Sequence, residues 1–271
     1  MIPYPNIDPV IVKLGSFEIR WYGMMYVLGF IAAFFVIGYL AARKKVRLTG
    51  DDLWDYIFYL MLGVLIGGRL GYCLFYAPAY YFYSPLKIFA LWEGGMSFHG
   101  GFLGVVLATA YYCWKKKVHF YDVGDIVVAA APVGLFLGRI GNFINSELYG
   151  RATDVAWCMV FPTGGEVCRH PSQLYEAFLE GLVIFVIVFV MNIRGVTRGV
   201  AMWTFILLYG AFRFFVEFFR EPDPHLGLVL GPFTLGQLLT VPMILAGVIM
   251  VVILLARRGE DAPSAGKRKK S

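Results

Sequence analysis

Charged side chains are scarce in this sequence. Asp, Glu, Lys and Arg make up 15% of its 271 residues, whereas hydrophobic residues make up 59%. Soluble domains usually contain about 25% charged residues. A globule of this size would have too little polar surface to cover itself, which excludes a soluble α/β enzyme and a disordered chain. The composition is that of an integral membrane protein.

Cysteine is rare as well, and several catalytic motifs are missing. The four cysteines are scattered, which excludes a disulfide-rich miniprotein and a cysteine-based metal cluster. The sequence has no H-E-x-x-H of a metalloprotease, no G-x-S-x-G nucleophile elbow and no G-x-x-x-x-G-K-[ST] phosphate loop. Any chemistry must therefore be carried by other side chains.

Long apolar segments are abundant instead. Seven of them are long enough to cross a hydrocarbon core about 30 Å thick. They cover residues 23–42, 53–76, 94–114, 124–140, 173–193, 199–219 and part of 224–256. The first is too long for a cleavable signal peptide, and its basic residues follow the apolar run. We therefore predict an all-α polytopic membrane protein with seven transmembrane helices.

The basic residues predict the orientation of these spans. Fifteen of the 24 Lys and Arg follow spans one, three, five and seven: Arg43, Lys44, Lys45, Arg47, Lys115, Lys116, Lys117, Arg194, Arg198, Arg257, Arg258, Lys267, Arg268, Lys269 and Lys270. Cytoplasmic loops carry such an excess of basic residues. We therefore expect an extracytoplasmic arm over residues 1–21, a membrane domain over 22–256 and a basic cytoplasmic tail over 257–271.

A polar stretch over residues 142–171 separates spans four and five, and it predicts a small extracytoplasmic head. Residues 157–161 and 166–169 flank a Pro-Thr-Gly-Gly turn and are expected to form a hairpin. Cys158 and Cys168 lie beside this turn, in what would be an oxidising compartment. Because an even-length turn directs them to opposite faces, a disulfide is allowed but not favoured.

Four spans carry polar side chains to one depth, near the outer surface of the membrane. These are Tyr22 in span one, His99 in span three, Arg139 with Asn142 and Glu147 in and after span four, and Tyr209, Arg213, Glu217 and Arg220 in span six. Spacings of four, four and three place the last group on one helical face. Ionisable groups in a membrane are costly, so this layer predicts a functional site. It has no Asp, Glu and His cluster of metal-ligand type, and we expect neither a metal nor another cofactor.

Most of these residues also have a plainer structural explanation. His99 can be a buried histidine bonded to a carbonyl, and Arg139 can extend to the interface as arginines at helix ends do. Arg213 and Glu217 can form an i, i+4 ion pair. That pair would leave two arginines without a partner, and Glu147 is a candidate to neutralise one of them.

Other features favour packing or the interface. Tyr22 can be one of the aromatic residues that line the membrane surface. The small residues Gly63, Gly67 and Gly71 of span two, and Gly100, Gly101 and Gly104 of span three, favour close helix packing. Arg69 is the main other charge that we expect inside the membrane.

Two or more arginines at head-group depth suit a lipid phosphate, because a guanidinium binds phosphate through two hydrogen bonds. A lipid-binding or lipid-processing site follows, with a nearby histidine as a base. A carrier or flippase would also place arginines here, but it needs a polar path to the inner leaflet, where the spans offer no matching basic groups. A membrane scaffold or receptor would not require Arg213 so deep in a span.

The run from Gly138 to Gly150, GRIGNFINSELYG, resembles the signature of the prolipoprotein diacylglyceryl transferase family. Four further motifs occur in the order expected for that family: Arg-Trp-Tyr-Gly at 20–23, His-Gly-Gly at 99–101, His-Pro-Ser-Gln-Leu-Tyr-Glu at 170–176, and the segment 213–222. The sequence departs from the family nowhere at the polar positions.

The resemblance implies a multi-pass enzyme of the bacterial inner membrane. Such an enzyme transfers the diacylglyceryl group of phosphatidylglycerol to the lipobox cysteine in the signal peptide of a preprolipoprotein. The product is a thioether, and glycerol phosphate is released.

The residues of the polar layer can be given roles in this reaction as a hypothesis. His99 would deprotonate the thiol, whose ordinary pKa is about 8.5, although a thiolate stabilised by arginine without His99 is an alternative. Arg139 and Arg213 would hold the phosphate and stabilise its departing charge, and Glu217 would orient Arg213. The head-group site would comprise Arg139 together with Asn142, Glu147, Tyr22, Tyr209 and Arg220.

Overall fold

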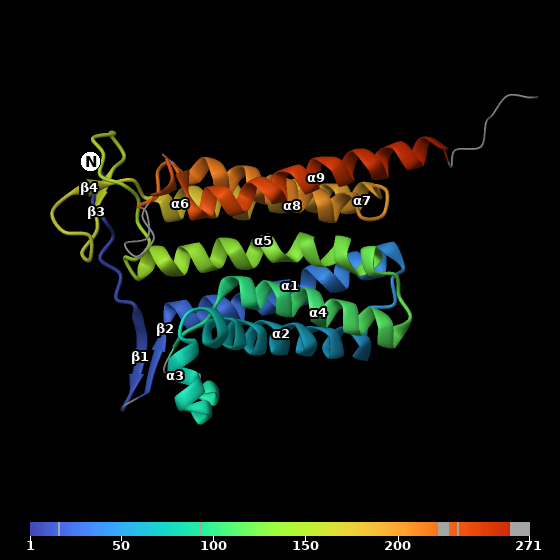
Figure 1. Ribbon diagram of the computed structural model, residues 1–271, viewed down its shortest axis with the longest axis horizontal. Coiled ribbons are helices and arrows are strands. Elements are labelled where there is room, and N and C mark those ends of the chain that lie inside the picture. The colour runs from blue at the N-terminus through green and yellow to red at the C-terminus, as the bar shows by residue number, and fades with distance from the viewer. Residues whose placement is uncertain (16, 91, 93, 222–227, 232, 261–271) are drawn as a thin grey trace, which may run out of the picture. The chain divides into compact units, whose positions relative to one another are not determined.

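A computed structural model describes residues 1–15, 17–90, 92, 94–221, 228–231 and 233–260 of the chain. They form two compact units, which we describe separately. The first unit comprises residues 1–32 and 127–271, and the second comprises residues 33–126. Figure 1 labels the elements of both.

Helices dominate the first unit. It contains the start of α1 (Trp21–Lys44), most of α5 (Phe120–Ile144), α6 (Ser172–Glu176), η3 (Ala177–Val183), α7 (Ile184–Arg194), α8 (Val200–Val216) and α9 (Leu235–Glu260). The segment α6–η3–α7 is one helix whose middle part, η3, is π-helical. Helices α8 and α9 pack along each other.

Three antiparallel hairpins of two short strands each complete the described part of the first unit. They pair β1 (Val10–Leu14) with β2 (Phe17–Arg20), β3 (Met159–Val160) with β4 (Cys168–Arg169), and β5 (Leu228–Leu230) with β6 (Phe233–Thr234). The β3–β4 pair confirms the hairpin expected between spans four and five. The β1–β2 hairpin lies in the N-terminal arm, where no strand was predicted.

The second unit is built on two helices, α2 (Asp51–Phe75) and α4 (Phe98–Lys116), which pack along each other. Between them come α3 (Pro78–Tyr83) and η1 (Pro85–Phe89). The packing face confirms the role predicted for the glycines except Gly101, where an added Cβ meets only Val64 O at 3.7 Å. At Gly63, Gly67, Gly100 and Gly104 an added Cβ would overlap the backbone of the facing helix.

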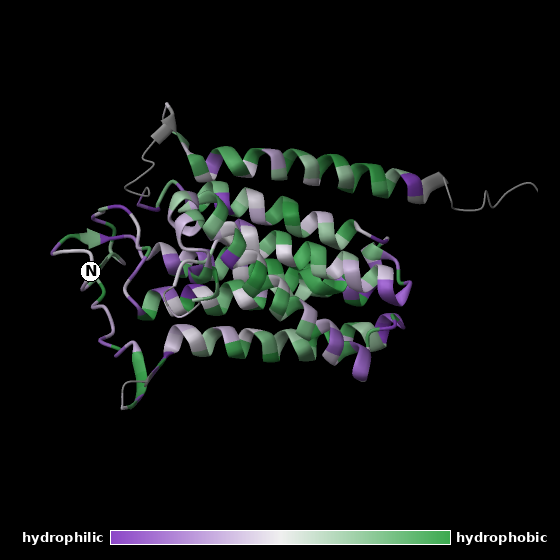
Figure 2. Cartoon of the chain, turned by 60° about the horizontal axis from the view of Figure 1, so that its bottom comes forward, coloured by the Kyte–Doolittle hydropathy of each residue, from purple (hydrophilic) through white to green (hydrophobic). Residues whose placement is uncertain are grey.

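Five described helices are long and apolar enough to cross a membrane: 21–44, 51–75, 120–144, 172–194 and 235–257. The two other predicted spans are helices as well, α4 and the shorter apolar α8. Figure 2 shows hydrophobic residues along the helices and hydrophilic ones mainly at their ends and in loops.

Several predicted span limits differ from the structure: α5 extends four residues beyond both limits of span four, whereas spans three and six are shorter than predicted. Helix α4 begins at Phe98 and not at Gly94, because Gly94 and Gly95 have φ of +79° and +81°, which no right-handed helix contains. Ser97 caps the helix instead, and its Oγ accepts a hydrogen bond from the Gly100 N–H at 3.2 Å. Helix α8 ends at Val216, three residues before the limit predicted for span six.

The prediction that a disulfide between Cys158 and Cys168 was not favoured is wrong, since the two cysteines are bonded. The argument assumed that both lie in paired strands. Cys168 does, opposite Val160, but Cys158 precedes β3 and its N–H bonds back to Val155 O in a turn. Strand alternation therefore does not set the direction of its side chain.

Candidate functional site

Six charged side chains of the first unit gather where α5, the α6–η3 helix and the end of α8 lie close together. We call them the arginine–glutamate cluster: Arg139, Glu176, Glu180, Arg213, Glu217 and Arg220. The side chains of Arg139, Arg213 and Arg220 are 19%, 14% and 10% exposed, whereas those of Glu176 and Glu180 are fully buried. The arginines are therefore the members that a ligand can reach.

Glu176 is the shared counter-ion of all three arginines. Its Oε2 lies 2.7 Å from Arg139 Nη2 and 2.8 Å from Arg213 Nη1. Its Oε1 lies 3.6 Å from Arg220 Nη1. One carboxylate oxygen thus holds two guanidinium groups side by side, a spacing that suits the oxygens of a phosphate.

Glu217 pairs with Arg213, as the i, i+4 spacing predicted. Arg213 Nη2 lies 2.8 Å from Glu217 Oε2, and Thr234 Oγ1 donates to Glu217 Oε1 at 3.0 Å. Thr234 also caps α9, because its Oγ1 accepts from the Gln237 N–H. The start of α9 therefore fixes Glu217, which in turn orients Arg213.

Arg139 is held on its other side by Asn142 in the last turn of α5, which is bonded in turn to the loop that follows. Its Nη1 donates to Asn142 Oδ1 at 3.3 Å, and Asn142 Nδ2 donates to Glu147 Oε1 at 2.8 Å. Asn145 Nδ2 also donates to this oxygen, at 3.3 Å. The Glu147 carboxylate thus accepts from two amides, while Glu176 meets the arginines.

This loop is fixed in a demanding backbone conformation. Ser146 and Leu148 have φ of +55° and +56°, in the left-handed region that non-glycine residues rarely adopt. Two residues of α6 hold it: Ser172 Oγ donates to Leu148 O at 3.1 Å, and Gln173 Nε2 donates to Glu147 O at 2.7 Å. A strained backbone conformation of this kind persists where the surrounding contacts hold it in place.

Arg220 lies beyond α8 and not on it. It forms a β-bridge with Gly150, and the Arg151 N–H donates to Phe219 O at 2.9 Å. A side chain on Gly150 would overlap Phe219 O and His170. This close backbone crossing brings Arg220 to the cluster from the chain beyond α8. The sequence pattern predicted a continuing helix there.

The two predicted tyrosines also lie in the first unit. Tyr22 packs against Gly141, next to Asn142, and its hydroxyl is 3.3 Å from that of Tyr26. Tyr209 is one turn before Arg213 on α8 and interacts electrostatically with Glu180.

His99 belongs to the second unit, in the first turn of α4. Its side chain is exposed, so the explanation as a buried structural histidine is wrong.

Arg69, the other charge expected inside the membrane, has a different environment in the second unit. It donates to five backbone carbonyls: Lys87 O at 2.6 Å, Ile88 O at 2.8 Å, Ala90 O at 3.0 Å, Gly95 O at 3.2 Å and Gly94 O. These bonds match all five N–H groups of a guanidinium. Arg69 is 2% exposed and pins the segment that precedes α4.

Sequence reasoning missed Glu176 and Glu180. Both lie in predicted span five, which was treated as apolar, and Glu176 was noted only as the last letter of a motif. The signal was present: two acids four residues apart lie on one helical face, inside a segment where any charge is a functional candidate.

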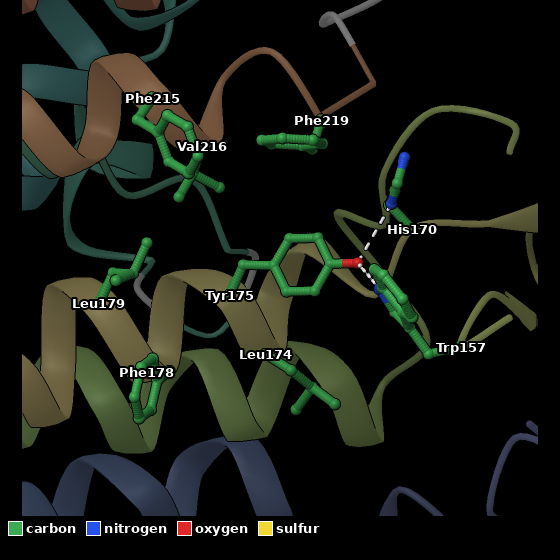
Figure 3. A pocket seen from close by; sticks show the side chains of 9 residues that line it. All are labelled: Trp157, His170, Leu174, Tyr175, Phe178, Leu179, Phe215, Val216 and Phe219. Carbon is green, nitrogen blue, oxygen red and sulfur yellow. Dashed lines mark hydrogen bonds between the residues drawn. The ribbon is translucent and has the colours of Figure 1, made fainter. Parts of the chain in front are cut away.

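An apolar pocket of about 440 Å³ lies between the α6–η3 helix and the end of α8 (Figure 3). Its lining residues are Trp157, His170, Leu174, Tyr175, Phe178, Leu179, Phe215, Val216 and Phe219. Its polar end is made by the Tyr175 hydroxyl, which accepts from Trp157 Nε1 at 2.7 Å and lies 3.1 Å from His170 Nδ1. Burial lowers the pKa of His170, which keeps the ring neutral at pH 7.

Among the described residues, no three His, Cys, Asp or Glu side chains are grouped so as to hold a metal ion.

Comparison with known proteins identifies the family. The family model described as prolipoprotein diacylglyceryl transferase matches residues 9–253. The chain belongs to the prolipoprotein diacylglyceryl transferase family. The resemblance seen in the sequence motifs is thereby confirmed.

Similar proteins cover almost the whole chain. A Geobacter sulfurreducens protein is 59% identical over 255 residues, which are 94% of this chain and 98% of the relative. A Pseudoalteromonas translucida protein is 49% identical over 93% and 94% of the two chains, and one from Bordetella parapertussis is 50% identical over 91% and 95%. All three are named phosphatidylglycerol–prolipoprotein diacylglyceryl transferase.

Proposed function

We infer that this chain transfers the diacylglyceryl group of phosphatidylglycerol to the cysteine thiol of a prolipoprotein. The names of relatives up to 59% identical over nearly the full length support this activity. The structural observation that carries it is the convergence of the partly exposed Arg139 and Arg213, and of the buried Arg220, on the buried carboxylate of Glu176. Apolar helices surround this cationic site, as an enzyme acting on an anionic lipid requires.

The roles of the two central arginines follow from their geometry. Glu176 holds Arg139 and Arg213 side by side on one carboxylate oxygen, and together they would bind the phosphate of phosphatidylglycerol. The cysteine thiolate attacks the glyceryl carbon that bears the phosphate ester, and the C–O bond breaks. Its electron pair goes to the phosphate oxygen, so that glycerol phosphate leaves. The arginines stabilise this growing charge, an effect worth roughly a hundredfold to a thousandfold in rate for one donor.

The thiol proton needs an acceptor before or during the attack. His99 is our candidate base, and its exposure in the first turn of α4 supports access to a substrate. A thiolate stabilised by the arginines without His99 is the alternative. A His99→Ala variant with the wild-type rate of diacylglyceryl transfer would favour this alternative.

The glycerol head group would be recognised by the last turn of α5, the loop after it and their neighbours. Its hydroxyls need hydrogen-bond donors and acceptors, which Asn142 and Glu147 supply. Tyr22 and Tyr209 would line the site, and Arg220 would add a third positive charge.

We further propose seven spans, formed by the five long helices together with α4 and α8, in the bacterial inner membrane. The head over residues 142–171 and the N-terminal arm over 1–21 would be extracytoplasmic, and the membrane domain would cover 22–256. The Cys158–Cys168 disulfide supports an oxidising compartment for the head. The cytoplasmic tail over 257–271 lies largely outside the described residues.

The test uses the purified protein with phosphatidylglycerol and a lipobox peptide that carries either Cys or Ser, read by mass. The proposal expects a gain of one diacylglyceryl mass on the Cys peptide only. Binding of phosphatidylglycerol with no mass gain would indicate a lipid carrier or flippase and would refute the enzyme.

A further inference from the structure

Glu180 differs from every other member of the arginine–glutamate cluster. Each of its carboxyl oxygens lies 4.0 Å from the nearest arginine nitrogen, Oε2 from Arg139 and Oε1 from Arg213. Neither oxygen has a hydrogen-bond partner among the described residues, and the side chain is fully buried. Glu176, four residues earlier, meets the same two arginines at 2.7 Å and 2.8 Å.

The position of Glu180 is enforced by the backbone. The π-helical turn η3 keeps its side chain on the same face as Glu176, under the same pair of arginines. Gly181 packs so closely on Phe136 of α5 that an added Cβ would lie 2.6 Å from the Phe136 Cβ. This close packing fixes the helix against α5 at the residue next to Glu180.

A buried carboxylate without hydrogen bonds is far more costly than a neutral carboxylic acid. Two carboxylates that share one site also disfavour double ionisation, as in carboxyl dyads of known enzymes. Glu176 has the stronger contacts and therefore keeps the negative charge.

The charged and titratable groups that face Glu180 set the net charge around it. They are Arg139 from α5, Glu176 from α6, Tyr209 and Arg213 from α8, and Arg220 beyond it. With every acid of the cluster ionised, three arginines and three glutamates sum to zero, and the site would have no net attraction for an anion.

We propose that Glu180 is a positioning residue that works as a neutral carboxylic acid and thereby gives the cluster a net charge of +1, equal and opposite to the single charge of a phosphodiester. This inference rests on the proposed function, since it concerns recognition of the lipid phosphate. Glu176 and Glu217 orient the arginines, and the protonated Glu180 fills the space beneath them without cancelling their charge.

The matched variants are Glu180→Gln and Glu176→Gln, the same change one helical turn apart. Because an amide has the shape and charge of a neutral acid, we expect Glu180→Gln to change kcat/KM for phosphatidylglycerol far less than Glu176→Gln does. Glu176→Gln removes the shared counter-ion and should reduce kcat/KM more than about tenfold. As pH rises, wild-type KM should increase when Glu180 ionises, and Glu180→Gln should lack this increase.

A second measurement does not depend on activity. The infrared spectrum of the wild type at neutral pH should contain a carboxylic-acid C=O band that is absent from Glu180→Gln. Absence of that band in the wild type would overturn the proposal, as would a loss of more than about tenfold in kcat/KM for a folded Glu180→Gln. An inactive wild type with the band present would refute the proposed function and leave the protonation state of Glu180 established.

Discussion

Two arginine sites show how differently one residue type is used in this protein. Arg69 in the second unit donates to five backbone carbonyls and is buried. Arg139 and Arg213 in the first unit contact side-chain oxygens, chiefly the carboxylate of Glu176, and remain partly exposed. The first arrangement uses every donor on neutral backbone groups, whereas the second pairs the arginines with acidic and amide side chains.

The difference gives a general criterion for intramembrane arginines. Backbone carbonyls are neutral and belong to the fold, so an arginine saturated by them stabilises a loop and offers a ligand nothing. Arginines held from behind by a buried carboxylate are oriented and still cationic. Charge alone therefore does not identify a site; the partner of the charge does.

The largest effect is expected at the arginine–glutamate cluster. Arg139→Lys and Arg213→Lys keep a positive charge but lose the planar pair of donors that binds phosphate. We expect the transfer rate to fall about a hundredfold or more, with a melting temperature close to that of the wild type. Rate measurements on detergent-purified protein check this, and a loss below about threefold would remove these arginines from the mechanism.

Arg69→Met should lower the stability more than the transfer rate. It leaves five carbonyls of the segment before α4 without their donor. Because a buried acceptor left unsatisfied costs about 1–3 kcal/mol, we expect the free energy of unfolding to fall by at least that amount. The rate per folded molecule should fall far less than for the cluster variants. Thermal unfolding measures the stability, and titration of the active molecules gives the transfer rate per folded molecule. An unchanged melting temperature of Arg69→Met would contradict the structural role of Arg69.

Gly150→Ala tests the backbone crossing that carries Arg220. An added methyl group overlaps Phe219 O and His170, so Arg220 must move. We expect transfer to fall about tenfold, the loss of roughly 1.4 kcal/mol of transition-state stabilisation. Gly134→Ala is the matched control, since an added Cβ there meets no atom within 4 Å. Equal transfer rates for Gly150→Ala and Gly134→Ala would show that the backbone crossing does not position Arg220.

The smallest effect concerns His170 at the polar end of the pocket. Burial lowers its pKa in the folded state. The unfolded chain then binds a proton more readily, so this residue should reduce stability as pH falls through the ordinary histidine value of about 6.5. His170→Gln should flatten the pH dependence of the melting temperature between about pH 7 and 5. An unchanged slope would show that His170 does not contribute to it.

Much of the fold followed from composition and periodicity, and the exceptions have identifiable causes. The apolar segments were located because bilayer thickness fixes their length. The early limit of span three was wrong because glycines at positive φ look like any apolar residues in a hydropathy pattern. The Cys158–Cys168 bond was missed because its first cysteine lies in a turn, whose geometry strand alternation does not describe.

The site was predicted in part. Arginine spacing indicated Arg213 and Glu217 as a pair, and Asn142 was placed beside Arg139. Glu176 and Glu180 were overlooked, although two acids four apart in an apolar helix were a visible signal. The carbonyl partners of Arg69 had no such signal, because backbone groups are the same in every residue and only the folded loop brings them together.

The most direct test of the central claim is equilibrium binding of phosphatidylglycerol, measured by native mass spectrometry on purified variants. If the arginine–glutamate cluster binds the lipid phosphate, Arg139→Lys and Arg213→Lys should each weaken binding at least about tenfold, roughly 1.4 kcal/mol. Folded Arg69→Met should bind like the wild type. Equal affinity in all four proteins would contradict the account.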